Sequence, residues 1–103
     1  MNLNIGGYPF EGPFNETKDL KNAPGLYAVH IQQDEEYTLV DLGQAADVQA
    51  SVRGHSRQDC WLRHSKGGLI SFSAYYTPDL PAEVRAQMEG LIREELNPPC
   101  GLG

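Results

Sequence analysis

The side chains best suited to chemistry gather in a short basic window between residues 53 and 66. Four cations and a single acid, Asp59, lie in this window, although the whole chain carries a formal charge of −6. A focused cationic patch can attract a polyanion even on an acidic protein, but a cluster this short is also typical of an ordinary solvated surface. The residues predicted to bind nucleic acid are Arg57, Arg63, His64 and Lys66.

Two cysteines and two histidines supply ligand types that suit zinc, and these are His55, Cys60, His64 and Cys100. Cys60 and His64 are one helical turn apart, yet the sequence lacks the paired Cys-x-x-Cys knuckle of many structural zinc sites. A structural zinc is therefore the less favoured interpretation. Because the sequence shows no secretory signal and lone disulfides are rare in a reducing cytosol, we expect free thiols.

The length and composition favour one cytoplasmic α+β domain over residues 1–103. A chain of 103 residues is long enough for one hydrophobic core and too short for two. No apolar run approaches the length of a membrane span, so no membrane partner is expected. The net acidity excludes the uniformly basic surface that many nucleic-acid-binding proteins carry.

Alternating apolar residues predict the strands that position the candidate side chains. Residues 25–31 and 36–42 flank the polar loop 32–35, which favours an antiparallel hairpin, and residues 69–76 are expected to form a third strand. His30 alternates with two aliphatic neighbours and is expected to be partly exposed on the opposite face.

Helical spacing predicts three helices around this sheet. Residues 45–52 and 58–64 favour two short helices separated by Gly54, and the apolar repeat from residue 80 to 96 favours a longer one. Asp79 is expected to cap the long helix, and Trp61 is more typical of a core anchor than of a base-stacking residue.

The first two dozen residues are rich in glycine and proline and predict an irregular N-terminal arm over residues 1–24. A short strand at residues 3–5 could pair with the sheet edge. The expected fold class is a small three-stranded antiparallel sheet, four-stranded if the arm pairs, flanked by helices.

Three ordered motifs give the chain a resemblance to the GIY-YIG endonuclease family. The matching segments are Gly25-Leu26-Tyr27, Asp41-Leu42-Gly43, and Met88-Glu89-Gly90 followed by Asn97-Pro98-Pro99. The resemblance extends over residues 24–101 and implies a GIY-YIG-like fold and metal-dependent hydrolysis of phosphodiesters. The catalytic residues it implies are Tyr27, Arg53, His55 and Glu89.

Within this resemblance each matching residue has an implied role. Glu89 would hold Mg²⁺, Tyr27 would lie near the attacking water, and Arg53 or Arg57 would neutralise charge on phosphate, which are the functions that phosphoryl chemistry requires. Glu89 could equally belong to an ordinary helical ion-pair ladder with Arg85 and Arg93.

The chain departs from the family pattern at several positions. The tyrosine of the second motif is replaced by Asp41, the closing asparagine by Gly101, and the helix arginine falls on Ser51, two positions before Arg53. These departures favour an alternative function, that of a catalytically inactive scaffold that binds nucleic acid or a protein partner.

Overall fold

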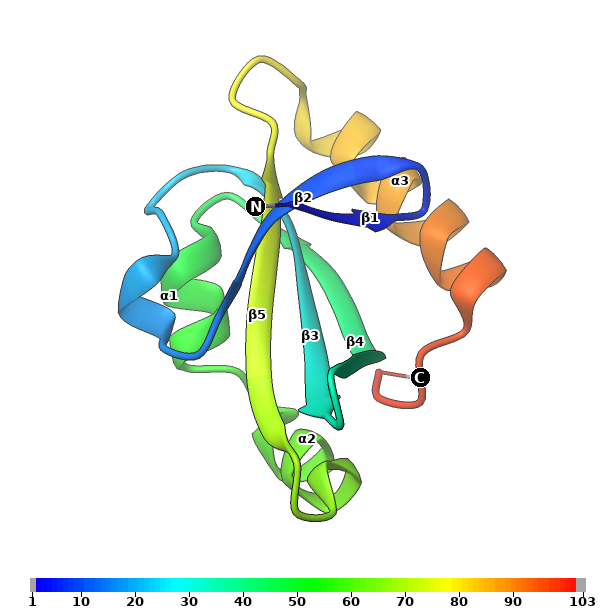
Figure 1. Ribbon diagram of the computed structural model, residues 1–103. Coiled ribbons are helices and arrows are strands. Elements are labelled where there is room, and N and C mark those ends of the chain that lie inside the picture. The colour runs from blue at the N-terminus through cyan, green and yellow to red at the C-terminus, as the bar shows by residue number, and fades with distance from the viewer. Residues whose placement is uncertain (1, 102–103) are drawn as a thin grey trace.

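A five-stranded antiparallel sheet in the order β1-β2-β5-β3-β4 forms the centre of the molecule (Figure 1). The structure is a computed structural model that describes residues 2–101; the other residues of the predicted domain, 1 and 102–103, lie outside this range. The strands are β1 (Asn2–Ile5), β2 (Tyr8–Phe14), β3 (Gly25–Gln33), β4 (Glu36–Ala45) and β5 (Leu69–Tyr76). The predicted α+β class is confirmed, but the sheet is larger than expected.

Residues 2–14 of the N-terminal arm form a hairpin, and its first strand contains the short strand expected at residues 3–5. Strands β1 and β2 pair with each other, and β2 pairs with β5, which adds two strands to the expected three. Gly6 and Gly7 make the turn with φ angles of 59° and 90°, a conformation that glycine adopts without steric cost. The glycines that predicted irregularity therefore mark a tight turn.

Strands β3 and β4 form the predicted hairpin with a shorter connection than expected. The expected loop of four residues is a turn of two, because Asp34 and Glu35 both adopt positive φ angles (53° and 67°) and the ladder continues to Gln33 and Glu36. Such a turn matches the twist of the strands that it joins. The paired strands are consequently longer than the apolar pattern indicated.

Within residues 2–101, three α-helices cover the two faces of the sheet, and a short 3-10 helix, η1 (Thr17–Asp19), follows β2. The α-helices are α1 (Val48–Arg53), α2 (Gln58–Ser65) and α3 (Ala82–Leu96). The side chain of Asp47 caps α1 by accepting from the backbone N–H of Ala50, which starts this helix later than predicted. The first residue of α3 follows Pro81, and Asp79 does not cap it.

Each face of the sheet has its own hydrophobic cluster. Tyr27, Val29 and Phe72 point toward α1 and α2 and pack with the buried Trp61, whereas Leu26, Ala28 and Leu42 point toward α3 and pack with Ile92. Trp61 is therefore a core residue, as expected. This alternation along β3 follows from the two-residue period of a strand.

A disulfide joins α2 to the C-terminal segment. Cys60 and Cys100 are bonded, with their Cα atoms 5.9 Å apart, so the expectation of free thiols was wrong. The backbone N–H of Cys100 donates to the carbonyl of Val40 (2.8 Å), which holds the C-terminal segment against β4 and brings the two sulfurs together. This proximity results from tertiary contacts that the spacing of the cysteines does not reveal.

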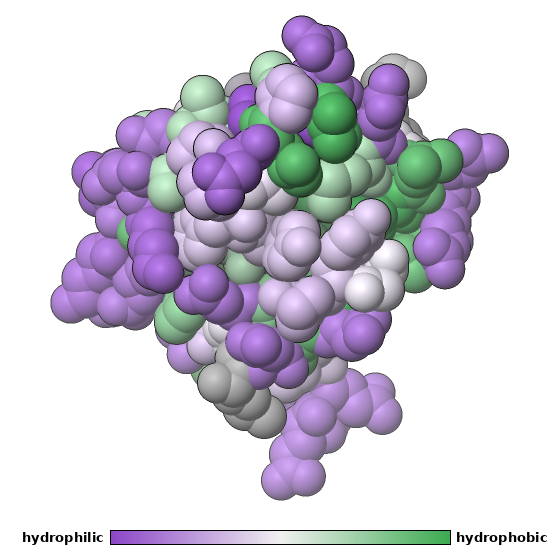
Figure 2. Space-filling model, turned by 90° about the horizontal axis from the view of Figure 1, so that it is seen from above, coloured by the Kyte–Doolittle hydropathy of each residue, from purple (hydrophilic) through white to green (hydrophobic). Residues whose placement is uncertain are grey.

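On the face seen in Figure 2, hydrophilic residues form most of the edge of the view and a few hydrophobic residues are exposed between them. Among residues 2–101, no helix combines the length and the apolar character needed to cross a membrane.

Candidate functional site

Tyr27 and His55 form a hydrogen-bonded pair at the end of α1. The hydroxyl of Tyr27, on β3, lies 2.6 Å from Nε2 of His55, in the segment between α1 and α2. Tyr27 pairs with Gly43 across the sheet, and a Cβ at residue 43 would overlap the tyrosine hydroxyl. The glycine that ends the second motif thus provides the space in which the Tyr27 hydroxyl meets His55.

The hydrogen bonds of His55 define the direction of proton donation in this pair. The backbone N–H of Arg57 donates to Nδ1 of His55 (3.0 Å), so Nδ1 must be unprotonated. Burial lowers the pKa of His55, and the Arg57 charge lowers it further, which favours the neutral imidazole near pH 7. The proton of the neutral ring therefore lies on Nε2, which donates to the Tyr27 oxygen.

The pKa of Tyr27 is raised above its ordinary value by burial, and the side chains of Ser51 and Arg57 offset this effect in part. Tyr27 thus retains its proton at neutral pH. Its oxygen accepts from His55, and its own O–H remains a donor. Ser51, where the sequence resemblance would require arginine, makes a polar side-chain contact with Tyr27 and carries no charge.

Asp41 is the centre of a buried ionic network. Its carboxylate is fully buried and accepts from Nε and Nη2 of Arg57 (2.8 and 3.2 Å), from Trp61 Nε1 (2.8 Å), and from Arg93. Burial alone would raise the pKa of Asp41, but the hydrogen bonds from Arg57 and Trp61 lower it below its ordinary value. Asp41 is therefore ionised and saturated with donors.

The network brings Arg57, rather than Arg53, next to the Tyr27–His55 pair. The Arg53 side chain is exposed and donates to Gln49 on its own helix (3.1 Å). Arg57 is close enough to affect the pKa values of Tyr27, His55 and Glu89. Because Nε and Nη2 of Arg57 bind Asp41, the remaining amino group Nη1 is the part of the guanidinium that can reach a ligand.

Glu89 lies on α3 at the edge of the same network. Its carboxylate is 3.9 Å from Nε of Arg93, one of the two arginines of the expected ion-pair ladder. The other, Arg85, binds the side chain of Gln44 instead (2.8 Å). Burial raises the pKa of Glu89, and the charges of Arg93 and Arg57 counteract it only in part. Glu89 is thus a partly exposed carboxylate that could accept a cation.

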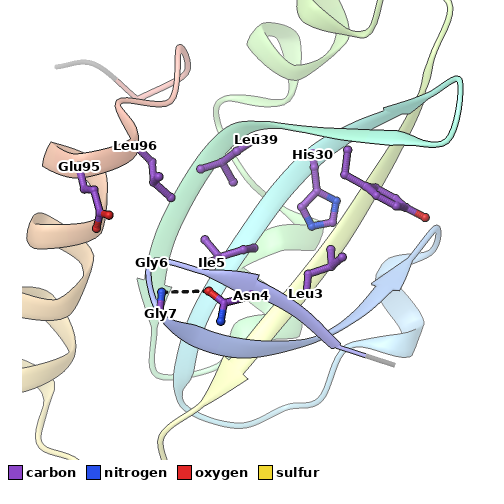
Figure 3. Close-up of a pocket in the computed structure, with 10 residues that line it drawn as sticks. Leu3, Asn4, Ile5, Gly6, Gly7, His30, Leu39, Glu95 and Leu96 are labelled. Carbon is purple, nitrogen blue, oxygen red and sulfur yellow. Dashed lines mark hydrogen bonds between the residues drawn. The ribbon is translucent and has the colours of Figure 1, made fainter.

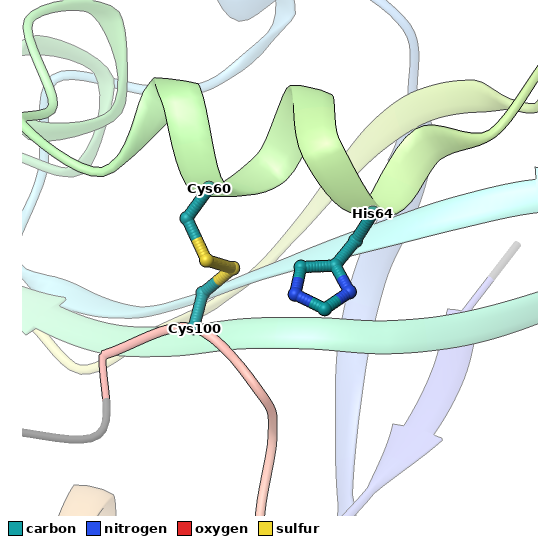
Figure 4. A group of neighbouring side chains, drawn as sticks. All are labelled: Cys60, His64 and Cys100. Atoms are coloured by element: carbon teal, nitrogen blue, oxygen red, sulfur yellow. A yellow bond between two sulfur atoms is a disulfide. The ribbon is translucent and has the colours of Figure 1, made fainter.

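The predicted nucleic-acid-binding residues lie at three places in the structure. Arg57 and Arg63 line a hollow of about 510 Å³ together with Ser56 and Gly101. Lys66 is exposed and ends α2 in a left-handed conformation with φ of 43°. His64 points instead toward the disulfide, as Figure 4 shows.

A second pocket lies on the opposite face, between β1, β4 and the end of α3 (Figure 3). Its volume is about 440 Å³, and Leu3, Ile5, Leu39 and Leu96 supply much of its apolar lining. His30 lies at this pocket but is 2% exposed, so its predicted partial exposure was wrong. Its two ring nitrogens lie 2.7 and 2.8 Å from the hydroxyls of Ser71 and Ser73 on β5, which explains its burial.

The pairing of Asp41 with Arg57 and Arg93 is not apparent from the sequence. Asp41 lies between Val40 and Leu42 in an apolar strand. A carboxylate buried in such a strand requires cationic partners, so the sequence position of Asp41 could have predicted a buried ion pair. The identity of those partners depends on the tertiary fold.

No family model, curated protein or solved structure matches this chain.

Proposed function

We propose that this protein hydrolyses phosphodiester bonds in nucleic acid, with Tyr27, His55, Arg57 and Glu89 as the reacting site. The observation that carries the proposal is the position of Arg57. Its guanidinium is held by Asp41 beside the Tyr27–His55 pair and within electrostatic range of Glu89. The cation of Arg57, the hydroxyl of Tyr27 and the carboxylate of Glu89 thus lie near one another. Arg57 would take the role of the arginine that the resemblance implies and that Ser51 replaces.

Arg57 is suited to bind the phosphate. The double hydrogen bond to Asp41 fixes the plane of the guanidinium, and such a preorganised cation loses little freedom when it meets an anion. Arg63 lines the same hollow and would contact a neighbouring phosphate. Asp41 offsets one of the positive charges of Arg57 and Arg93, so these three residues together carry a net charge of +1, which faces Glu89 at the edge of the network.

Glu89 is the carboxylate suited to hold Mg²⁺. Mg²⁺ is often bound through one or two protein carboxylates together with waters and substrate phosphate oxygens, so a single partly exposed glutamate fits this mode. Asp41 does not fit, because its oxygens already accept four side-chain hydrogen bonds. When bound, Mg²⁺ would act as a Lewis acid on the phosphate and lower the pKa of a coordinated water.

Tyr27 and His55 would orient the water that attacks phosphorus. His55 donates to the tyrosine oxygen and thereby fixes the direction of the hydroxyl. A hollow of about 330 Å³ next to His55 is lined by Ser51, Gly54 and Ser56 and gives solvent access to this side of the pair. Positioning of this kind supplies a large part of the rate enhancement in phosphoryl transfer.

The experiment that tests hydrolysis is a cleavage assay on single-stranded and branched DNA with Mg²⁺ or Mn²⁺. Glu89→Gln should abolish metal-dependent cleavage, because the amide is neutral and binds Mg²⁺ poorly. Glu94→Gln makes the same chemical change at an exposed position of the same helix and should cut at the wild-type rate. Equal cleavage by wild type and Glu89→Gln would contradict the proposal.

A second candidate function is that of a catalytically inactive module that binds nucleic acid or a protein partner. The observation that favours it is the saturation of the site: Asp41 has donors on both oxygens, and Tyr27 is only 3% exposed. In that case the hollow at Arg57 and Arg63 would be the binding surface, and the wild-type protein would bind DNA without cutting it.

Salt dependence identifies the binding module. Each phosphate contact that a cation makes steepens the fall of affinity with salt, so Arg63→Ala should weaken DNA binding and reduce the salt slope by about one. Arg53→Ala, on an exposed side chain that binds Gln49, is the matched control. If the wild type binds DNA with this salt dependence but does not cut it, the function is binding and not hydrolysis. If it does not bind DNA at all, the partner to look for is a protein.

A further inference from the structure

The disulfide between α2 and the C-terminal segment has a third potential metal ligand beside it. One nitrogen of His64 and the sulfurs of Cys60 and Cys100 all lie within 4.8 Å of one another. Figure 4 shows the His64 ring on the same side of α2 as Cys60, one turn farther along, with the bonded sulfurs near its edge. These donors come from two separate segments, α2 and the C-terminal segment.

We propose that Cys60, His64 and Cys100 form a zinc site when the disulfide is reduced. Two thiolates and an imidazole match the preference of Zn²⁺ for sulfur and nitrogen ligands, whereas Mg²⁺ prefers oxygen. This site is separate from Glu89 and does not depend on the proposed hydrolysis. Bound zinc would replace the disulfide as the connection between α2 and the C-terminal segment.

The distances permit this exchange with small movements. In a tetrahedral zinc site the two sulfurs would be roughly 3.8 Å apart and each would lie about 3.5 Å from the nitrogen, given the usual zinc–ligand bond lengths. The three donor atoms already lie within 4.8 Å of one another. Breaking the S–S bond would let the sulfurs separate by side-chain rotation, while the backbone contact between Cys100 and Val40 holds the segment in place.

The fourth coordination position would be taken by water. Among residues 2–101, the group that could hold a metal contains these three residues and no fourth. Cys60 borders the hollow of about 510 Å³, which is large enough for several waters. Three protein ligands and one water form the open arrangement that zinc adopts outside purely structural sites.

Reduction would proceed by exchange with a dithiol. A thiolate of the dithiol attacks Sγ of the partly buried Cys60, and the S–S electron pair leaves with the fully buried Cys100 as a thiolate. The second dithiol sulfur then attacks the mixed disulfide, which releases Cys60 as a thiolate and oxidises the dithiol to a cyclic disulfide. Two electrons pass to the protein, and the two protons of the dithiol are released to solvent when Zn²⁺ binds both thiolates.

Cobalt titration tests the site, because Co²⁺ occupies zinc sites and reports thiolate ligands by its absorption. The protein is reduced with a dithiol, which is removed under anaerobic conditions, and Co²⁺ is added. We expect one Co²⁺ per chain with the visible bands of tetrahedral coordination and a thiolate-to-cobalt band in the near ultraviolet. Zn²⁺ should displace the cobalt, and the oxidised protein should show none of these bands.

Two variants test whether His64 is a metal ligand. His64→Ala retains the cysteines but should lose at least about 10-fold in affinity for Co²⁺, since even the loss of an outer-shell partner costs that much. Leu62→Ala changes a residue of the same helix that is 60% exposed and is not a possible ligand, and it should bind as wild type does. Equal affinity of wild type and His64→Ala, or no cobalt binding by the reduced protein, would overturn the proposal.

The folded state of the reduced chain provides a second readout. If reduction lowers the far-ultraviolet circular dichroism, one equivalent of Zn²⁺ should restore it in the wild type and not in His64→Ala. Failure of zinc to restore the signal would also count against the site.

Discussion

The hydroxyl of Tyr27 and Nε2 of His55 lie 2.6 Å apart although 28 positions separate the two residues in the sequence. The backbone N–H of Arg57 occupies the other ring nitrogen, so the imidazole donates to the tyrosine oxygen. This arrangement makes Tyr27 a fixed hydroxyl beside a cation, and it supplies the first test of the proposed chemistry.

Tyr27→Phe removes the hydroxyl and retains the packing of the ring. We expect Mg²⁺-dependent cleavage of DNA to fall by about 100-fold, the lower range for loss of a group that positions or transfers a proton. Affinity for DNA should change little, since Tyr27 is buried. Tyr37→Phe, on an exposed tyrosine of β4, is the matched control. An unchanged cleavage rate in Tyr27→Phe would remove this residue from the mechanism.

Asp41→Asn should destabilise the protein severely. It leaves Arg57 and Arg93 without their carboxylate in a largely buried site, and breaking a buried ion pair costs about 3 to 5 kcal/mol. Urea unfolding of Asp41→Asn and of Asp59→Asn, an exposed control on α2, would measure the difference. Similar unfolding midpoints for the two variants would mean that the network contributes little to stability.

The same carboxylate predicts a loss of stability in acid. Because the folded pKa of Asp41 is lowered, its contribution is present above the unfolded value of about 3.9 and is lost as pH falls through the folded value. Acid unfolding followed by circular dichroism should therefore show a weaker dependence on pH below about 4 in Asp41→Asn than in the wild type.

His30 predicts a second loss of stability in a different pH range. Burial lowers its folded pKa to about 4, so the unfolded chain binds a proton more readily between pH 6.5 and 4. The contribution of neutral His30 to the free energy of unfolding should be fully present above pH 6.5 and should fall by about 3 kcal/mol as the pH approaches 4. Urea unfolding at several pH values measures this slope, and NMR titration of the His30 ring checks the pKa.

His30→Gln provides the control for this titration, because it removes the titrating ring and keeps a polar side chain beside the hydroxyls of Ser71 and Ser73. Between pH 6.5 and 4 the slope should be smaller in His30→Gln than in the wild type. An NMR pKa of His30 near 6.5 would show that its burial does not control this range.

Loss of the disulfide should lower stability in the absence of metal. The bond joins residues separated by 40 positions, and closing a loop of that length reduces the entropy of the unfolded chain by an amount worth about 4 kcal/mol. Urea unfolding of the oxidised protein and of Cys60→Ser would measure this difference. Equal midpoints would indicate that the C-terminal segment is held by its contacts with β4 alone.

Local patterns in the sequence were sufficient to place several elements. The alternation in residues 69–76 matched β5, and the apolar repeat from residue 80 to 96 includes all of α3, because the period of a strand or helix is a property of neighbouring residues. The strand expected at residues 3–5 is part of β1, but β2 was missed, since its pairing with β5 joins segments far apart in the chain.

The candidate site shows the same division between local and long-range information. Residue types in the sequence were enough to select Tyr27, His55 and Glu89 as chemically capable and to mark Arg57 as an alternative to Arg53. Only the tertiary structure placed Arg57 on Asp41 and joined Cys60 to Cys100 beside His64. The physical reason is that a side chain's reactivity follows its residue type, whereas its partners are determined by how strands and helices distant in sequence pack together.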